Sequence, residues 1–229
     1  MVIRNLALVK ERIENAAKKA GRDPADIRLM PVTKTATIKQ LHDVLVSGVS
    51  DIGENRVKDA IFKYNLLGQA AKAVKWHMIG HLQTNKTALC LSMFDVIHSL
   101  DSINLAREID KQAYLSGKRI DCLIEVNISG EISKYGIAPG DVCGFVKQTS
   151  SFPNINLIGL MTIAPIVKNR EDVRPYFNNL RLLRDSIVSA GYRNIKELSM
   201  GMTQDFEIAV EEGATIVRIG SAIFNSQVN

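Results

Sequence analysis

The chain has 229 residues, of which 46% are hydrophobic and 23% are charged, and its formal net charge at pH 7 is +5. This balance is typical of a folded globular domain and excludes a disordered chain. No apolar stretch is long enough to cross a bilayer, and no basic run alternates with aromatic residues as in a nucleic-acid groove. We therefore expect a protein without a membrane or nucleic-acid partner.

The first apolar pattern covers residues 3–20, where hydrophobic side chains recur at helical spacing and Gly21 follows in a C-cap position. Charged residues interrupt this segment too early for the apolar region of a secretion signal. The sequence therefore predicts an amphipathic N-terminal helix and a cytoplasmic protein.

Beyond residue 21, short apolar runs alternate with helical patterns. The runs predicted as strands are 28–33, 50–53, 75–80, 94–100, 120–128, 155–161, 196–199 and 214–219. The segments predicted as helices are 37–47, 56–72, 83–92, 102–116, 139–150, 171–190, 203–212 and a short one at 221–225. Eight strands each followed by a helix predict an α/β fold, a single (β/α)8 TIM-type barrel with an extra N-terminal helix. An open doubly wound sheet is the alternative. No Pro/Gly/Ser-rich linker divides the chain, so one domain over 1–229 is expected.

Lys34 is a lone cationic residue at the end of the first predicted strand. The C-terminal ends of parallel strands are where α/β barrels place their chemistry. A lysine that is partly desolvated there can lose its proton and form a Schiff base with an aldehyde. Lys34 is thus the first candidate for a functional residue.

The last two predicted strands end in turns that suit an anion. Gly201 and Gly220 would let the backbone approach a phosphate, Ser199 and Ser221 carry hydroxyl groups, and Ser221 opens the final short helix. Either glycine alone would be an ordinary turn residue. Two such turns after strands seven and eight match the common phosphate site of barrels, so the sequence predicts a phosphate cradle here.

Arg218 lies within an otherwise apolar strand. Burial of a guanidinium is costly unless it is paired or binds a ligand. A lysine that suits an aldehyde and a cradle that suits a phosphate together indicate pyridoxal phosphate. If Arg218 faced the ring nitrogen of that group, the nitrogen would stay unprotonated, because Arg does not give up its proton. The ring would then be a weaker electron sink. A structural ion pair is the alternative.

Three further residues follow predicted strands and have ordinary structural explanations as well. Asn55 suits either a ligand contact or a helix cap, His81 either acid–base chemistry or a structural hydrogen bond, and Met161 either a ligand platform or the core. His77 and His81 are four residues apart, but no cysteine or carboxylate cluster accompanies them, so no metal site is expected. The three cysteines, Cys90, Cys122 and Cys143, are predicted to be buried free thiols.

Seven segments in order along the whole chain resemble the pyridoxal phosphate homeostasis proteins (the YggS/PROSC family), which are similar to the N-terminal barrel of alanine racemase, a fold-type III pyridoxal phosphate (PLP) protein. The matching segments are VTKT at 32–35, IGENR at 52–56, WHMIGHLQTNK at 76–86, VNISGE at 126–131, GLMT at 159–162, LSMGMT at 198–203 with Asp205 and Phe206, and VRIGSAIF at 217–224.

This resemblance implies a role for each matched position. Lys34 would carry PLP as a Schiff base, and Arg218 would face the pyridine nitrogen. The residues around the phosphate would be Ser199, Met200, Gly201, Gly220 and Ser221, and those beside the ring would be Asn55, His81 and Met161. The family implies a PLP-binding barrel, often monomeric, that buffers the cofactor or delivers it. PLP-dependent apoenzymes would be the recipients in the second case. The family has no established reaction, so no catalytic residues are expected. The chain departs from the family pattern at Thr33, Ile132, Tyr135 and Asn225.

Three functions fit these residues. The first is a non-catalytic PLP carrier involved in PLP homeostasis. The second is a PLP-dependent amino-acid racemase of fold-type III, for which Lys34 would be one base. Alanine racemase draws its second base, a tyrosine, from a C-terminal β-domain that we do not expect here. The third is an aldolase-like barrel that uses Lys34 without PLP, which the two glycine turns permit but the full motif series does not favour.

Overall fold

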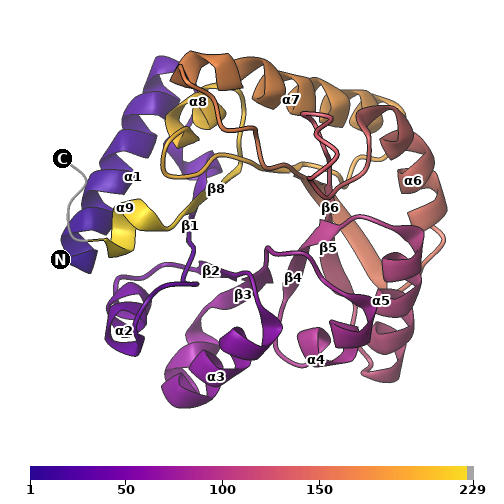
Figure 1. The fold of residues 1–229 in the computed structure, drawn as a ribbon, viewed down its shortest axis with the longest axis horizontal. Coiled ribbons are helices and arrows are strands. Elements are labelled where there is room, and N and C mark those ends of the chain that lie inside the picture. The colour runs from indigo at the N-terminus through magenta and orange to yellow at the C-terminus, as the bar shows by residue number, and fades with distance from the viewer. Residues whose placement is uncertain (226–229) are drawn as a thin grey trace.

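The computed structural model describes residues 1–225 and consists of eight parallel strands surrounded by helices. In Figure 1 the helices form an outer layer around the ring of strands. The strands are β1 (Arg28–Pro31), β2 (Asp51–Glu54), β3 (Lys75–Met78), β4 (Val96–Leu100), β5 (Ile120–Glu125), β6 (Ile155–Met161), β7 (Glu197–Ser199) and β8 (Ile216–Ile219). They run in the order β1-β8-β7-β6-β5-β4-β3-β2, so the predicted TIM-type barrel is confirmed and the open doubly wound sheet is wrong.

One helix precedes β1, one follows β8, and each of the others connects two consecutive strands, as the alternating pattern predicts. They are α1 (Val2–Lys19), α2 (Ile38–Val46), α3 (Val57–Leu67), α4 (Thr87–Leu91), α5 (Ile103–Leu115), α6 (Val142–Thr149), α7 (Arg174–Ser189), α8 (Phe206–Glu211) and α9 (Ser221–Phe224). Short 3-10 turns precede α4, α6 and α7 and follow α3. Within residues 1–225, no helix combines the length and the apolar character needed to cross a membrane.

The barrel closes between β1 and β2 just beyond the end of β1. A single parallel bridge pairs Val32 with Gly53, and the backbone N–H of Thr33 donates to the Gly53 carbonyl at 2.9 Å. The other neighbours form parallel ladders, with register shifts in β4–β5 and β5–β6 and a short contact between β7 and β8. The ring is therefore complete, and its closing junction directly precedes Lys34.

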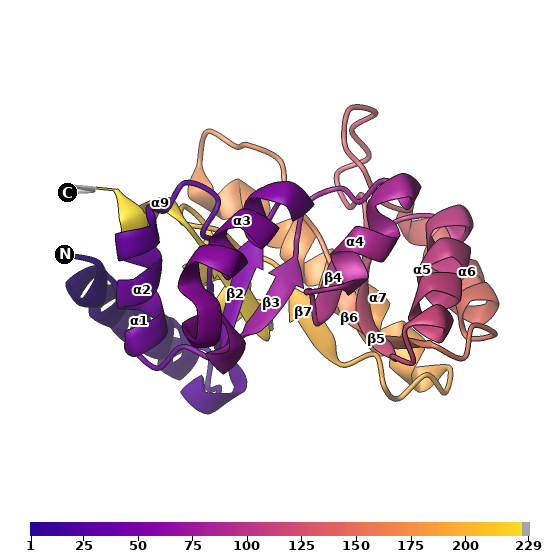
Figure 2. The ribbon, with the colours of Figure 1, turned by 90° about the horizontal axis from the view of Figure 1, so that it is seen from below.

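Helix α1 packs against the side of the barrel that also carries α9. Its apolar stripe is buried, and it contacts α8 and α9. Figures 1 and 2 both show α1 beside α9. The Asn5 side chain donates to the Ile223 carbonyl at 3.0 Å. The first helix thus supports the last one.

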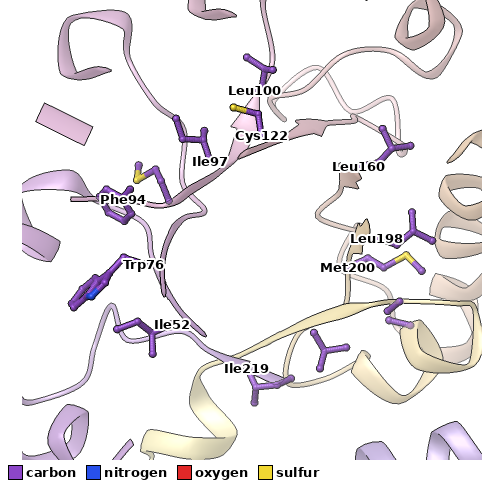
Figure 3. Packing of buried hydrophobic residues seen from close by; sticks show 14 of the residues in the cluster. Ile52, Trp76, Phe94, Ile97, Leu100, Cys122, Leu160, Leu198, Met200 and Ile219 are labelled. Carbon is purple, nitrogen blue, oxygen red and sulfur yellow. The ribbon is translucent and has the colours of Figure 1, made fainter. Parts of the chain in front are cut away.

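The hydrophobic core lies mainly between the strands and the helices. Figure 3 shows strand residues such as Ile52, Trp76, Ile97, Leu198 and Ile219 on the outer side of the ring. Because successive side chains of a strand point to opposite faces, the residues next to them point into the barrel. Barrel interiors are usually filled by branched apolar residues, whereas these neighbours include Asp51, His77, His98, Ser199 and Arg218.

Several predicted elements end elsewhere for identifiable reasons. The helix predicted over 56–72 stops at Leu67, because Gly68 has φ +56°. The helix predicted over 203–212 begins only at Phe206, because the Asp205 side chain accepts the Met202 N–H at 2.6 Å and shapes a loop. The strand predicted over 120–128 ends at Glu125, after which Asn127 binds the backbone of the following loop.

The prediction of three buried thiols is wrong for one of them. Cys90 and Cys122 are buried, but Cys143 is exposed on α6. Its neighbour Val142 lies on the buried face of that helix, so a one-residue step turns the thiol toward solvent. None of the described residues forms a disulfide or a cluster of three metal-ligating side chains.

Candidate functional site

Lys34 lies in the turn that follows β1, on the rim formed by the C-terminal ends of the strands. The Thr33 carbonyl closes this turn by accepting the N–H of Ala36 at 3.0 Å. The Lys34 side chain is exposed and makes no hydrogen bond or ion pair with residues 1–225. The expected partial desolvation is therefore absent, but the amine is free to meet a ligand at the rim.

A buried ion pair beneath Lys34 fixes the turn. Lys63 Nζ lies 2.6 Å from Glu54 Oε1 and donates to the Thr33 carbonyl at 2.5 Å. The Thr33 hydroxyl also donates to Glu54 Oε1 at 2.5 Å. These contacts tie the end of β1 to the end of β2 and to α3. Sequence reasoning missed them, because Lys63 is one charged residue among several on an amphipathic helix.

Arg218 occupies the barrel interior and is held from two sides. Its Nη1 donates to the Ser199 hydroxyl at 2.9 Å, and its Nη2 donates to the Thr162 carbonyl at 2.8 Å. Burial lowers the pKa of Arg218 to about 10, although Asp205 and Glu125 act in the opposite direction. The guanidinium therefore stays charged at neutral pH, in the buried position that the sequence predicts. Its partners are a hydroxyl and a carbonyl, not the structural ion pair considered as the alternative.

Two histidines extend this contact across the barrel. Ser199 Oγ lies 3.0 Å from His98 Nδ1, His98 Nε2 lies 2.8 Å from His77 Nδ1, and His77 Nε2 lies 2.8 Å from Asp51 Oδ1. We call Asp51, His77, His98, Ser199 and Arg218 the interior chain. Each of its five residues is less than 5% exposed. Sequence reasoning identified only Arg218 and Ser199; the polar residues at inward positions of β2, β3 and β4 are the signal that it overlooked.

The charges of the interior chain follow from its surroundings. Burial tends to raise the pKa of Asp51, but hydrogen bonds from His77 and Ser50 outweigh it and lower the pKa to about 2. Burial, together with the nearby His77, Arg218 and Arg28, holds the pKa of His98 well below its ordinary value. At neutral pH the interior chain therefore has an anion at Asp51, a cation at Arg218 and a neutral imidazole at His98.

This arrangement gives Ser199 a role that differs from the predicted one. Its hydroxyl is buried, faces the barrel interior and is engaged by Arg218 and His98, so it does not extend toward a phosphate at the rim. Met200 is also buried, and its side chain points outward into the hydrophobic layer (Figure 3). At these two positions only the backbone is placed to face a ligand.

The loops after β7 and β8 lie side by side, as predicted for a phosphate cradle. The Arg218 N–H donates to the Gly201 carbonyl at 3.0 Å, and the Ala222 N–H donates to the Thr203 hydroxyl at 3.3 Å. Gly201 has φ +89°, and a Cβ there would lie 2.5 Å from the Ala209 Cβ. Only glycine suits this close approach.

The second of these loops leads directly into α9. Gly220 is the N-cap residue of this short helix, and the exposed Ser221 is its first residue. The backbone of this turn is therefore presented at the rim, next to the loop that contains Gly201.

Asn55 and His81 lie on the same rim, after β2 and β3. Asn55 is half-buried and does not cap α3, whose N-cap is Arg56. The backbone of Asn55 packs so closely on Gly80 that a Cβ on Gly80 would lie 2.3 Å from the Asn55 carbonyl. His81 is exposed, lies 3.2 Å from an Asp101 carboxylate oxygen, and stacks on Tyr135 with ring centroids 3.9 Å apart. Tyr135, one of the residues that depart from the family pattern, thus contacts His81. Ile132, another of these residues, is fully exposed.

The remaining predicted residue, Met161, is completely buried at the end of β6. It belongs to a small apolar cluster inside the barrel with Val96 and Leu123. Its neighbour across the strand ladder is Glu125. Burial, together with Asp101, raises the pKa of Glu125 to about 7, although Arg218 opposes the shift. Sequence reasoning did not single out Glu125.

A surface hollow of about 580 Å³ lies at the opposite end of the barrel. It is lined by residues at the N-terminal ends of β1 and β7, and by charged residues of both signs from α7 and α8. Arg28 there pairs with Glu197 at 2.7 Å. The active sites of barrels lie at the other rim, and none of the predicted site residues lines this hollow.

Comparisons with known proteins agree with this arrangement. The family model for the alanine racemase N-terminal domain matches residues 5–227. A pyridoxal phosphate homeostasis protein of Aquifex aeolicus is 43% identical over 222 residues, which cover 97% of this chain and 96% of that protein.

Solved structures show the same fold. A structure described as an unknown protein from Bifidobacterium adolescentis has a TM-score of 0.93 at 37% identity, over 97% of this chain and 94% of that one. PipY of Synechococcus elongatus, with PLP bound, has a TM-score of 0.85 at 29% identity, over 98% of this chain and 100% of that one. With these near full-length matches, the chain belongs to the pyridoxal phosphate homeostasis proteins of the alanine racemase N-terminal domain family.

Proposed function

We propose that this protein binds PLP covalently through a Schiff base on Lys34 and acts as a carrier or buffer of the cofactor, without a reaction of its own. The observation that carries the proposal is the position of Lys34. Its amine lies exposed on the same rim as the paired loops at Gly201 and Gly220. PLP has an aldehyde at one side and a phosphate at another, and a family relative, PipY, has been solved with PLP bound.

The residues present fit this group. A primary amine free of protein partners is what an aldehyde needs for Schiff-base formation. The close approach that excludes a Cβ at Gly201 brings the β7 loop against α8 and leaves the backbone at the rim, and backbone N–H groups at a helix start attract anions. When bound, PLP would supply an electron-withdrawing ring. Asn55 and His81 would border that ring from the neighbouring strand ends, while Met161 would lie beneath it inside the barrel.

Arg218 supports the carrier proposal over catalysis. It is charged, buried, and held by Ser199 and Thr162. A guanidinium that faced the ring nitrogen would donate a hydrogen bond without transferring its proton. The ring would then be a poor acceptor of carbanion charge, which disfavours racemisation. We propose that the ligand is retained and released unchanged.

The decisive experiment combines PLP addition, borohydride reduction and peptide mapping. We expect visible absorbance from the bound cofactor, and a reduced PLP adduct on Lys34. Lys34→Ala should lose both, whereas Lys39→Ala, which removes an exposed lysine from the first turn of α2, should retain both. A visible absorbance that persists in Lys34→Ala would contradict the assignment.

The alternatives are separated by the same preparation. A racemase would exchange the α-proton of amino acids with solvent, whereas a carrier would not. An aldolase-like protein would stay colourless with PLP and would be trapped by borohydride only together with its substrate. We expect neither result.

A further inference from the structure

The interior chain has only one arrangement of protons when both of its histidines are neutral. Arg218 has donors and no acceptor, so the Ser199 oxygen accepts from Arg218, and the Ser199 O–H is free to donate to His98 Nδ1. A neutral imidazole whose Nδ1 accepts must carry its proton on Nε2. His98 therefore donates from Nε2 to His77 Nδ1.

This order is required by the other end of the interior chain. The Asp51 carboxylate is ionised at neutral pH, because its pKa is about 2, and an ionised carboxylate only accepts. His77 therefore donates from Nε2 to Asp51 and accepts at Nδ1. With both imidazoles neutral, the Asp51 end thus requires every hydrogen bond to run in the direction from Arg218 to Asp51, and the Arg218 end accommodates that order.

A chain of this kind restrains its members more than isolated contacts would. Aligned hydrogen bonds polarise one another in a low-dielectric interior, and all five residues are less than 5% exposed. The charged groups around the chain are Arg28 at the Asp51 end, at 3.8 Å from Asp51, and Asp205 and Glu125 at the Arg218 end. An additional proton on either imidazole would reverse the bond to Ser199 and would place a cation between Arg28 and Arg218.

We propose that Asp51, His77 and His98 are positioning residues, which act through Ser199 to hold the Arg218 guanidinium in a fixed orientation at the base of the site. Two N–H groups of Arg218 are occupied by Ser199 and Thr162, so its orientation leaves the remaining N–H groups for a ligand. This inference rests on the proposed PLP site for its functional part. The order of the protons does not depend on it.

The first test uses the unmodified protein without PLP. Nitrogen-15 NMR of the imidazole rings distinguishes protonated from unprotonated ring nitrogens, and the protein has only four histidines. Variants His42→Gln and His81→Gln, both at exposed positions, would each lose the signals of one ring. The signals that remain in both variants belong to His77 and His98. We expect His77 and His98 to be neutral at pH 7, with the proton on Nε2 in both. A proton on Nδ1 in either ring, or a doubly protonated ring, would overturn the proposed chain.

The second test interrupts the chain at His77, which is separated from Arg218 by His98 and Ser199. In His77→Leu both side-chain bonds are lost, whereas in His77→Gln the amide can accept from His98 and donate to Asp51. We expect PLP to bind about tenfold more weakly to His77→Leu, as for the loss of a bond that orients a charged group, and within about threefold of the wild type to His77→Gln. Thermal unfolding would verify that both variants are folded.

A matched control is Ser99, the buried serine that follows His98 on β4. Ser99 is completely buried, and its hydroxyl has no hydrogen-bond partner among the described residues, so Ser99→Ala should bind PLP within about twofold of the wild type. If folded His77→Leu bound PLP as tightly as the wild type, the positioning role would be wrong. If the wild type failed to bind PLP, the proposed function would be wrong, and the NMR result would still decide the proton order.

Discussion

Glu125 is a buried carboxyl group at the C-terminal end of β5, and its ionisation changes the stability of the fold. Burial and the nearby Asp101 raise its pKa from an ordinary 4.5 to about 7. The folded state then binds a proton more tightly than the unfolded state does. Stability contributed by this proton is fully present below pH 4.5 and is lost as the pH rises through 7.

Glu125→Gln should abolish this pH dependence. We expect the variant to exceed the wild type in unfolding free energy at pH 8 by up to about 3 kcal/mol, and the difference to disappear near pH 4. Urea unfolding of the PLP-free protein at both pH values would measure it. Glu14→Gln, at an exposed position of α1, is the control. A constant difference between Glu125→Gln and the wild type at both pH values would contradict the assigned shift.

Ser221 tests the phosphate cradle at the scale of one side chain. It is exposed at the first position of α9. A carboxylate there would repel a phosphate, although it suits the start of a helix. We expect Ser221→Asp to weaken PLP binding about tenfold, roughly 1.4 kcal/mol, with unchanged thermal stability. The neutral isostere Ser221→Asn should bind PLP nearly as well as the wild type. Equal affinity for Ser221→Asp and Ser221→Asn would remove the cradle from the proposed site.

Among the elements, the loop between β7 and α8 has the strictest steric requirement. Gly201 combines φ +89° with a Cβ position 2.5 Å from Ala209 and 3.0 Å from the Phe206 Cα. We expect Gly201→Ala to cost at least about 2 kcal/mol of unfolding free energy and to weaken PLP binding by displacing the loop.

Gly144 offers the opposite case within α6. It lies inside the helix, and a methyl group added to its Cα would meet no atom within 4 Å, so Gly144→Ala should stabilise the protein by up to about 1 kcal/mol. Denaturant unfolding of both variants gives the comparison. A stability for Gly201→Ala equal to that of Gly144→Ala would show that the loop can shift without cost.

At the same scale, the sequence predicts the elements well but not the contacts within the barrel. The periods of apolar residues place every strand and helix within a few residues, because an outer hydrophobic layer requires them. Residues of the interior chain come from strands up to 167 positions apart, counted from Asp51 to Arg218. No local pattern indicates which of them meet. For the same reason, the sequence places Ser199 on the correct strand but misassigns the direction of its hydroxyl.

For the whole molecule, α1 completes the helical layer and links the beginning of the chain to its end. Leu6 is buried in the interface of this helix with the barrel, whereas Leu8 is 48% exposed. We expect Leu6→Ala to reduce the unfolding free energy by about 2–5 kcal/mol, and Leu8→Ala to change it by less than about 0.5 kcal/mol.

Because Asn5 binds the backbone of α9, loosening α1 should also weaken PLP binding at the rim. Urea unfolding and PLP titration of Leu6→Ala and Leu8→Ala measure the two effects. Similar unfolding midpoints for the two variants would show that α1 is an appendage and not a part of the core.

The junction between β1 and β2 is one of the places in the ring where neighbouring strands share a single residue pair. Where strands of the ring have hydrogen-bonded ladders on both sides, these ladders resist local opening of the sheet. Here one bridge at Val32 and Gly53 is reinforced mainly by the Lys63–Glu54 pair and the Thr33 carbonyl. Local opening in a protein begins where the fewest hydrogen bonds must break. The Thr33 amide, which donates to the Gly53 carbonyl across this junction, would then exchange with solvent sooner than amides within the longer β1–β8 ladder. The proposed attachment point, Lys34, thus directly follows one of the two junctions of the ring that have the fewest paired residues.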